Sequence, residues 1–229
     1  MVYVLHIANK NYSSWSLRPW LLMRQLAIPF NECLEVFSGG SNHEAFRVFS
    51  PTGRVPCLDD GEQVVWDSLA IVEHLAERHP GVWPADAVAR TWARCASAEM
   101  HSGFTALRTH CSMNCGLRIA LAAMPEALVA DIARIDELWC EGLQRFGGPY
   151  LAGTSFGAVD AFYAPVALRI QGFDLRLSDT ALAYANRLLQ LPAMREWYEA
   201  ALLEPWREAG HEEEVIASGR LVADLRAGA

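Results

Sequence analysis

The chain has 229 residues, 52% of them hydrophobic, so it is long enough to bury one large core or two modest ones. Acidic residues outnumber basic residues 27 to 19, and a net charge of -8 argues against nucleic acid as a partner. The apolar runs are short and interrupted by charges, so we expect neither a membrane-spanning helix nor a secretory leader, and therefore a cytoplasmic protein.

The first eighty residues alternate the patterns of strands and helices. Short apolar runs predict four strands, at residues 2–7, 30–37, 55–59 and 63–66, and an acidic turn joins the last two as a hairpin. Apolar residues spaced three or four apart predict helices that begin near residue 15 and at 43–49 and 69–76. This order predicts a four-stranded mixed sheet covered by helices.

Two serines lie where the first strand gives way to the first helix. Pro19 fits the first turn of a helix, which predicts that the helix begins at Trp15 or Ser16, directly after Ser13 and Ser14. Free backbone N–H groups and the positive end of the helix dipole favour an anion at this place. Serines before a helix also serve as simple N-caps, and this segment by itself favours that interpretation.

The rest of the chain has the period of helices. We expect a linker at residues 81–87, and then helices from about 87 to near 111, from 125, and at 158–170, 180–189 and 192–203. Asp160 can reach back to an open N–H at the start of the third of these, where Gly157 offers no side-chain oxygen. The charged tail after Pro205 has no clear pattern.

Six cysteines are spread through a chain too large to need disulfides, so reduced thiols are expected. His110, Cys111 and Cys115 have part of the spacing of a metal site, but no second pair of ligands completes it. We therefore predict no metal.

A second group of residues has the chemistry to hold the head of an amino acid. Asp67 can neutralise an α-ammonium group, while Ser68 and the N–H groups that open the next helix can hold an α-carboxylate. Taken alone, Asp67-Ser68 is most simply interpreted as a helix cap, and Pro56 as a proline of an edge strand. In order, Arg54-Val55-Pro56 followed by Asp67-Ser68 resembles the cytosolic-type glutathione transferases, and the likeness covers nearly the whole chain.

The resemblance implies an α/β thioredoxin-like domain at residues 1–80, a linker at 81–87 and an all-helical domain at 88–229 that holds the acceptor substrate. It also implies a homodimer that uses glutathione as co-substrate. In the family the Val-Pro bond is cis and presents the preceding backbone to the cysteinyl part of glutathione. The binding residues that it implies are Arg54, Val55, Pro56, Asp67 and Ser68, and His43 is a candidate for the glycyl carboxylate.

The segment Ser13-Ser14-Trp15-Ser16 resembles the serine run of the zeta class, whose first serine is taken as catalytic. Ser13 is therefore the first choice for the hydroxyl that stabilises the glutathione thiolate, and Ser14 is the second. Tyr12 stands where that class usually has an arginine, and Trp15 replaces its cysteine. Both departures weigh against the zeta-class substrate, and the loss of the arginine in particular should weaken binding of a dicarboxylate.

Trp15 and residues of the long helix are candidates for the acceptor pocket. The ordinary interpretation of Met100, Phe104 and Leu107 is a core stripe at helical spacing, and we favour it over the pocket, while His101 is a candidate polar residue of the pocket or a solvated group. The leading hypothesis is an enzyme, a glutathione S-transferase acting on small electrophiles. The alternatives are a zeta-like cis-trans isomerase or dehalogenase, and a non-catalytic binding module with the same fold.

Overall fold

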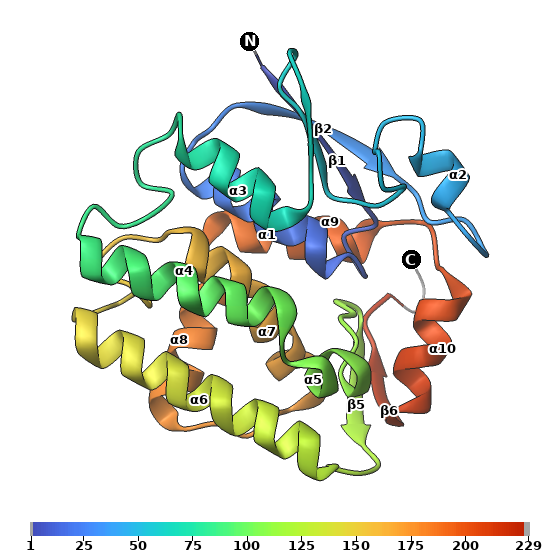
Figure 1. Cartoon of the computed structure of the whole chain (residues 1–229). Coiled ribbons are helices and arrows are strands. Elements are labelled where there is room, and N and C mark those ends of the chain that lie inside the picture. Colours follow the sequence, from blue (N-terminus) through green and yellow to red (C-terminus); the bar gives the residue numbers. More distant parts are fainter. Residues whose placement is uncertain (1, 227–229) are drawn as a thin grey trace.

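The computed structural model describes residues 2–226, and its N-terminal part is the predicted four-stranded mixed sheet (Figure 1). The strand order is β2-β1-β3-β4, in which β1 pairs with β2 in parallel and the other two pairs are antiparallel. The strands are β1 (Tyr3–Ala8), β2 (Phe30–Glu35), β3 (Cys57–Asp59) and β4 (Val64–Trp66).

Helices cover both faces of this sheet. Leu5 and Ile7 point to the buried face, which α1 (Ser14–Gln25) and α3 (Ser68–Ala76) cover, because alternate residues of a strand point to opposite faces. His6 points to the other face, where it stacks on Phe49 just after the short helix α2 (His43–Phe46). The helix α1 begins one or two residues before the predicted start and keeps Pro19 in its second turn.

The C-terminal part is mostly helical and packs directly on α1. Its central helix, α7 (Ala158–Phe173), contacts α1, α4 and α8 and is buried on nearly every side, as its almost uninterrupted apolar sequence requires. The surrounding helices are α4 (Ala87–Ser102), α5 (Thr105–His110), α6 (Glu126–Phe146), α8 (Asp179–Leu189), α9 (Pro192–Leu203) and α10 (Ala209–Ala217).

Two expectations for this part are wrong. The helix predicted from residue 87 to near 111 ends at Ser102, because Gly103 leaves the helical conformation and Phe104 takes a left-handed one with φ 53° before α5 begins. The C-terminal part is also not all-helical. β5 (Leu117–Leu121) pairs antiparallel with β6 (Gly219–Asp224), so the charged tail folds back as α10 and β6 along the edge of the molecule (Figure 1).

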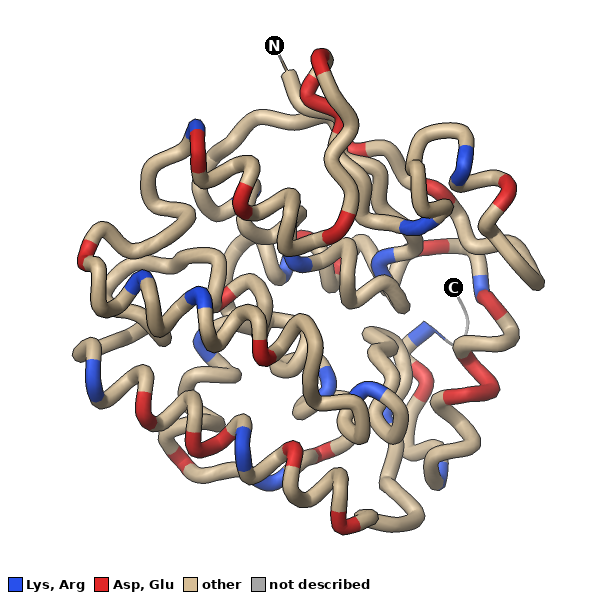
Figure 2. The backbone as a smooth tube through the Cα atoms, in the orientation of Figure 1, with Lys and Arg blue, Asp and Glu red and all other residues tan. Residues whose placement is uncertain are grey.

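Charged residues of both signs are spread along the whole tube and do not gather on one side (Figure 2). Within residues 2–226, none of the helices combines the length and the apolar character needed to cross a membrane.

Candidate active site

The N-terminus of α1 carries both predicted serines in a buried position. Ser13 is the N-cap residue, yet its side chain makes no capping hydrogen bond, and its hydroxyl donates to Oγ of Ser16 at 2.8 Å. Ser16 Oγ also accepts from the backbone N–H of Ala8 at 3.2 Å. The simple N-cap interpretation of Ser13 is therefore wrong, and the Ser13 proton is directed into this short hydroxyl chain.

Ser14 has a different partner. Its Oγ accepts a hydrogen bond from Nη2 of Arg169 on α7, at 3.4 Å. Arg169 is held in place because its Nε donates to the Cys111 carbonyl at 2.8 Å and its Nη1 to the Pro165 carbonyl at 3.3 Å. The Ser14 oxygen thus accepts a hydrogen bond from the guanidinium, and the Ser14 hydroxyl proton can still be donated to another group.

A cleft of about 710 Å³ opens beside these serines. Residues from six places in the chain line it, at 12–15, 37–46, 53–55, 108–113, 169 and 211–214. Its lining includes the cations Arg54, Arg108 and Arg169, while Glu214 is exposed and accepts from the Ser112 hydroxyl at 3.5 Å. This balance favours an anionic ligand.

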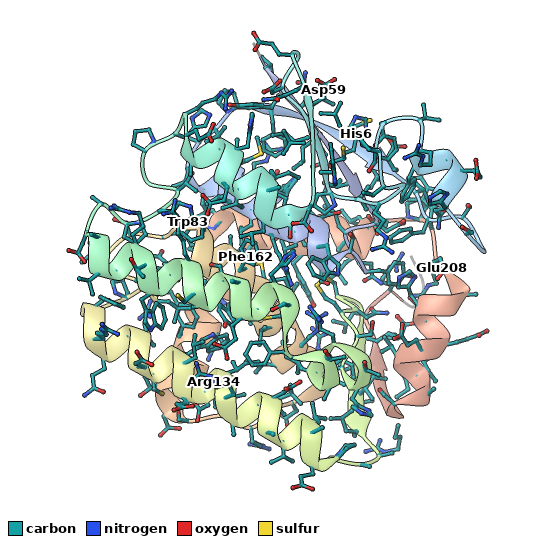
Figure 3. The ribbon with its side chains drawn as sticks, viewed as in Figure 1. His6, Asp59, Trp83, Arg134, Phe162 and Glu208 are labelled. Carbon is teal, nitrogen blue, oxygen red and sulfur yellow. The ribbon has the colours of Figure 1, made fainter. Side chains whose placement is uncertain are left out.

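Three buried or half-buried arginines, Arg18, Arg108 and Arg169, lie close to the cleft without a carboxylate partner in residues 2–226. Arg18 is 1% exposed. Its guanidinium stacks on two aromatic rings, 4.0 Å from the ring centre of Trp15 and 4.9 Å from that of Phe162. Its Nε and Nη1 atoms make no hydrogen bond in the described chain. Figure 3 shows the labelled Phe162 in the middle of the molecule. Arg108 lies over the same indole at 5.5 Å and donates to the His101 carbonyl at 3.2 Å.

Burial sets the electrostatics of this cluster. Burial, together with the neighbouring charges of Arg169 and Arg108, lowers the pKa of Arg18 to about 9. Burial also lowers the pKa of Arg169 to about 10 and lowers the pKa of Arg108. A guanidinium stays charged in proteins, so these shifts reflect cations that have lost water and repel one another. An anion that enters the cleft relieves both effects.

The Val55–Pro56 peptide bond is cis, as the resemblance implies. Val55, Arg54 and His43 line the same cleft as the serines, and the side chains of Arg54 and His43 are exposed there. Pro56 is buried behind them at the start of β3.

Asp67 and Ser68 lie at the N-terminus of α3 and are not part of the lining of this cleft. Asp67 has φ 75°, caps α3 by accepting from the Leu69 N–H at 2.8 Å, and is still 45% exposed. Ser68 is buried, and its hydroxyl makes no hydrogen bond in the described chain. His101 connects the two places, because its Nε2 is 3.4 Å from Oδ2 of Asp67 and its ring packs edge-on against Trp15.

The candidates for the acceptor pocket divide clearly. Trp15 lines the cleft and His101 contacts it from behind, whereas Met100, Phe104 and Leu107 are buried in the core and do not reach it. These three residues therefore do not form the predicted pocket: Met100 lies on α4, which packs on α7, Phe104 packs edge-on against Tyr163 of α7, and Leu107 lies on α5, which packs on α6.

Sequence reasoning missed Arg108, Arg169 and Arg18 as site residues. One signal was available for Arg169. It is the only basic residue in the apolar segment 158–173, and a buried charge needs a partner or a function. No local pattern distinguishes Arg18 or Arg108 from surface arginines, because packing against Trp15 decides their positions.

Comparisons with known proteins agree with this fold. Residues 12–78 match the family model for the glutathione S-transferase N-terminal domain. The chain is similar to glutathione S-transferase GstB of Escherichia coli (strain K12), with 28% identity over 212 residues, covering 86% of this chain and 92% of that protein. It is also similar to a probable maleylacetoacetate isomerase of Vibrio cholerae, with 28% identity over 173 residues, covering 69% and 77% of the two chains.

Among solved structures, a glutathione transferase homologue from Burkholderia with bound glutathione has the same fold. Its TM-score is 0.66 at 18% sequence identity, and the match covers 88% of this chain and 98% of that one. The family model matches the N-terminal part, and the relatives and the shared fold extend the likeness across both parts, so the chain is similar to glutathione S-transferases along most of its length.

Proposed function

We propose that this protein binds glutathione, stabilises its thiolate and adds it to a small electrophile that carries a carboxylate. The observation that carries the proposal is the pair of guanidinium groups, Arg108 and Arg169, that line the cleft beside the serines and make no ion pair within residues 2–226. A carboxylate on the acceptor can take two charge-assisted hydrogen bonds from such groups.

Residues 1–80 supply the groups that hold glutathione, and residues 88–229, beyond the linker at 81–87, supply the arginines. Asp67 meets the ammonium group of the γ-glutamyl end, and Ser68 with the N-terminus of α3 meets its carboxylate. The backbone of Val55 pairs with the cysteinyl part, and Arg54 or His43 meets the glycyl carboxylate. This arrangement directs the sulfur toward the N-terminus of α1.

Ser14 is the favoured partner of the sulfur, with Ser13 as the alternative. The Ser13 proton is directed to Ser16, whereas Ser14 accepts from Arg169 and has its own proton free to donate to a thiolate. The Arg169 charge behind Ser14 and the N-terminus of α1 add to the effect. Lowering a thiol pKa from about 8.5 by two units needs only about 2.7 kcal/mol, which such a set of groups supplies.

The reaction then needs no covalent bond to the protein. The thiolate attacks the β-carbon of a double bond conjugated to a carbonyl, a carbon–sulfur bond forms, and the electron pair moves onto the carbonyl oxygen. Water delivers the proton that completes the saturated product. Where the acceptor carries a leaving group instead, the same thiolate displaces it.

A second candidate is cis-trans isomerisation of an unsaturated diacid. Two guanidinium groups on one wall of the cleft favour it, and so does the similarity to a probable maleylacetoacetate isomerase. In that reaction the thiolate adds, the former double bond rotates as a single bond, and the thiolate leaves again, so glutathione is not consumed.

Thiolate absorbance in the ultraviolet, followed against pH with glutathione bound, tests thiol activation. We expect a bound thiol pKa well below 8.5 for the wild type, and a return toward that value in Ser14→Ala with glutathione affinity largely kept. Asp67→Ala should behave oppositely and weaken binding first. If only Ser13→Ala restored the ordinary thiol pKa, Ser13 would be the residue that contacts the sulfur. If the wild type bound glutathione with an ordinary thiol pKa, the non-catalytic binding module would be favoured.

A matched pair of acceptors tests the arginines. We expect Arg108→Gln to lower kcat/KM for an unsaturated carboxylic acid by about 10- to 100-fold, and to change kcat/KM for its methyl ester little, because a charged hydrogen bond is lost only with the acid. Arg176→Gln, which changes a highly exposed arginine, is the control. Equal losses for the acid and the ester would contradict the proposed role. Analysis of the products distinguishes addition from isomerisation.

A further inference from the structure

Three side chains with metal-binding atoms lie together on the sheet face opposite α1. His6 on β1 and Cys33 on β2 are direct partners in the parallel register, and Glu35 lies two residues further along β2. Partners in register and residues two apart point to the same face, so the pairing of two strands brings these side chains together. Figure 3 shows His6 within the sheet, away from the helical part.

The distances fit a small metal ion. His6 Nδ1 is 3.0 Å and Cys33 Sγ is 3.3 Å from the same oxygen, Oε1 of Glu35, and all three ligand atoms lie within 4.8 Å of one another. Tetrahedral zinc, with bonds of about 2.0 to 2.3 Å, separates its ligand atoms by about 3.4 to 3.6 Å. The two distances to Glu35 therefore need to lengthen by only a few tenths of an ångström, and His6 and Cys33, within 4.8 Å of each other, need to reach the same range.

The surroundings hold the ligands while leaving access. Phe49 stacks on the His6 ring at 4.2 Å between centres and 6° between planes, which fixes the orientation of the imidazole. The side chains of His6 and Glu35 are 16% and 28% exposed, so solvent reaches the cluster. None of the three side chains is among the residues that line the cleft described above.

We propose that His6, Cys33 and Glu35 form a zinc-binding site that links β1 to β2. A thiolate, an imidazole and one carboxylate suit zinc and not magnesium or calcium, which prefer oxygen ligands. On binding, the thiol proton of Cys33 leaves to solvent, and His6 binds through Nδ1 as the neutral tautomer that carries its proton on Nε2, so three bonds to the metal replace two hydrogen bonds. Water takes the fourth position.

Cobalt(II), titrated into the full-length protein in the absence of glutathione, gives a direct spectroscopic test. We expect one equivalent to produce a thiolate-to-cobalt charge-transfer band in the near ultraviolet together with visible bands of four-coordinate cobalt, and zinc to displace both. Cys33→Ser should lose the charge-transfer band, and Glu35→Gln should weaken cobalt binding by more than about tenfold. Cys95→Ser, which changes an exposed cysteine on α4, is the matched control and should keep every band.

A shift in thermal unfolding gives a second measurement. Excess zinc should raise the melting temperature of the wild type and of Cys95→Ser but not of Cys33→Ser, because only a metal bound to the folded state stabilises it. The proposal is overturned if the wild type gives no charge-transfer band, or if Cys33→Ser keeps it. Since neither measurement uses glutathione or an acceptor, failure here leaves the proposed function untouched.

Discussion

Asp160 is a fully buried carboxylate whose charge depends on three hydrogen bonds. It accepts from the N–H groups of Leu151 and Gly157, both at 3.0 Å, and from the Tyr184 hydroxyl at 2.7 Å. Burial nevertheless raises its pKa to about 6, and these hydrogen bonds only partly oppose the rise. The predicted capping role of Asp160 is confirmed, because its carboxylate reaches back to the N–H of Gly157.

This raised pKa gives a signed pH dependence of stability. Between pH 3.8, the ordinary value, and about 6, the folded state binds more protons at Asp160 than the unfolded state does. The stabilising contribution of Asp160 to the free energy of unfolding is therefore complete below pH 3.8 and is lost as the pH rises through about 6. The total loss is about 3 kcal/mol, because each unit of pKa difference corresponds to about 1.36 kcal/mol. The free energy of unfolding, measured with urea from pH 4 to 7, should change less with pH in Asp160→Asn than in the wild type.

Tyr184→Phe is the complementary variant, because it keeps the carboxyl group and removes one hydrogen bond that lowers the pKa. It should extend the declining part of the profile to higher pH. Parallel profiles for the wild type and Asp160→Asn would show that Asp160 does not titrate in this range.

The segment formed by α10 and β6 is attached to the loop that carries the serines. The Tyr12 hydroxyl donates to Glu212 at 2.6 Å and accepts from the Glu208 N–H and from Arg226, both at 3.2 Å. His211 of α10 stacks on the Tyr12 ring, with 5.0 Å between centres, and lines the cleft. Tyr12 therefore anchors the C-terminal segment to the loop that carries the serines.

Removing one oxygen atom tests this attachment. We expect Tyr12→Phe to keep the stacking, to leave Glu212 and Arg226 short of a partner, and to destabilise the segment by about 1–3 kcal/mol. Hydrogen exchange at the amides of α10 and β6 should become faster while exchange in α7 stays unchanged. Tyr163→Phe is the control, because the Tyr163 hydroxyl donates to the Ala96 carbonyl and not to the C-terminal segment. Faster exchange of α10 and β6 in both variants would contradict a specific anchor at Tyr12.

The sheet edge at β4 has an apolar surface that a second copy of the chain can cover. Val64 and Trp66 are 38% and 45% exposed, and with residues of α3 they line a hollow of about 670 Å³. Exposed apolar surface of this kind favours association, and self-association through one patch gives a twofold dimer. We therefore propose that the protein forms a homodimer through β4 and α3.

Sedimentation equilibrium decides this directly. The wild type should have twice the chain mass of 25.4 kDa, and Trp66→Glu should shift the mass toward that of one chain, because a charge is buried at the contact. Leu203→Glu, at a residue that is 78% exposed on α9, should leave the mass unchanged. A wild-type mass of 25.4 kDa, or loss of the dimer in both variants, would contradict the proposed surface.

Local patterns predicted most of the helices and all four strands of the main sheet, because each depends on neighbours within about ten residues. The pairing of β5 with β6 was missed, since residues 117–121 and 219–224 lie about a hundred positions apart and neither run alone indicates its partner. The break at Gly103 was missed for a similar reason, because a single glycine often stays within a helix.

The sequence alone was enough to indicate the family, the serines at the start of α1 and the Val55-Pro56 and Asp67-Ser68 pairs, since short segments carry these features. Only the tertiary structure brings Arg169 to Ser14, stacks Arg18 on Trp15 and places Cys33 beside His6. It also removes Met100, Phe104 and Leu107 from the cleft. The physical reason is that packing between distant segments determines where a side chain points and which charges lose their water, and those properties give the cleft its preference for anions.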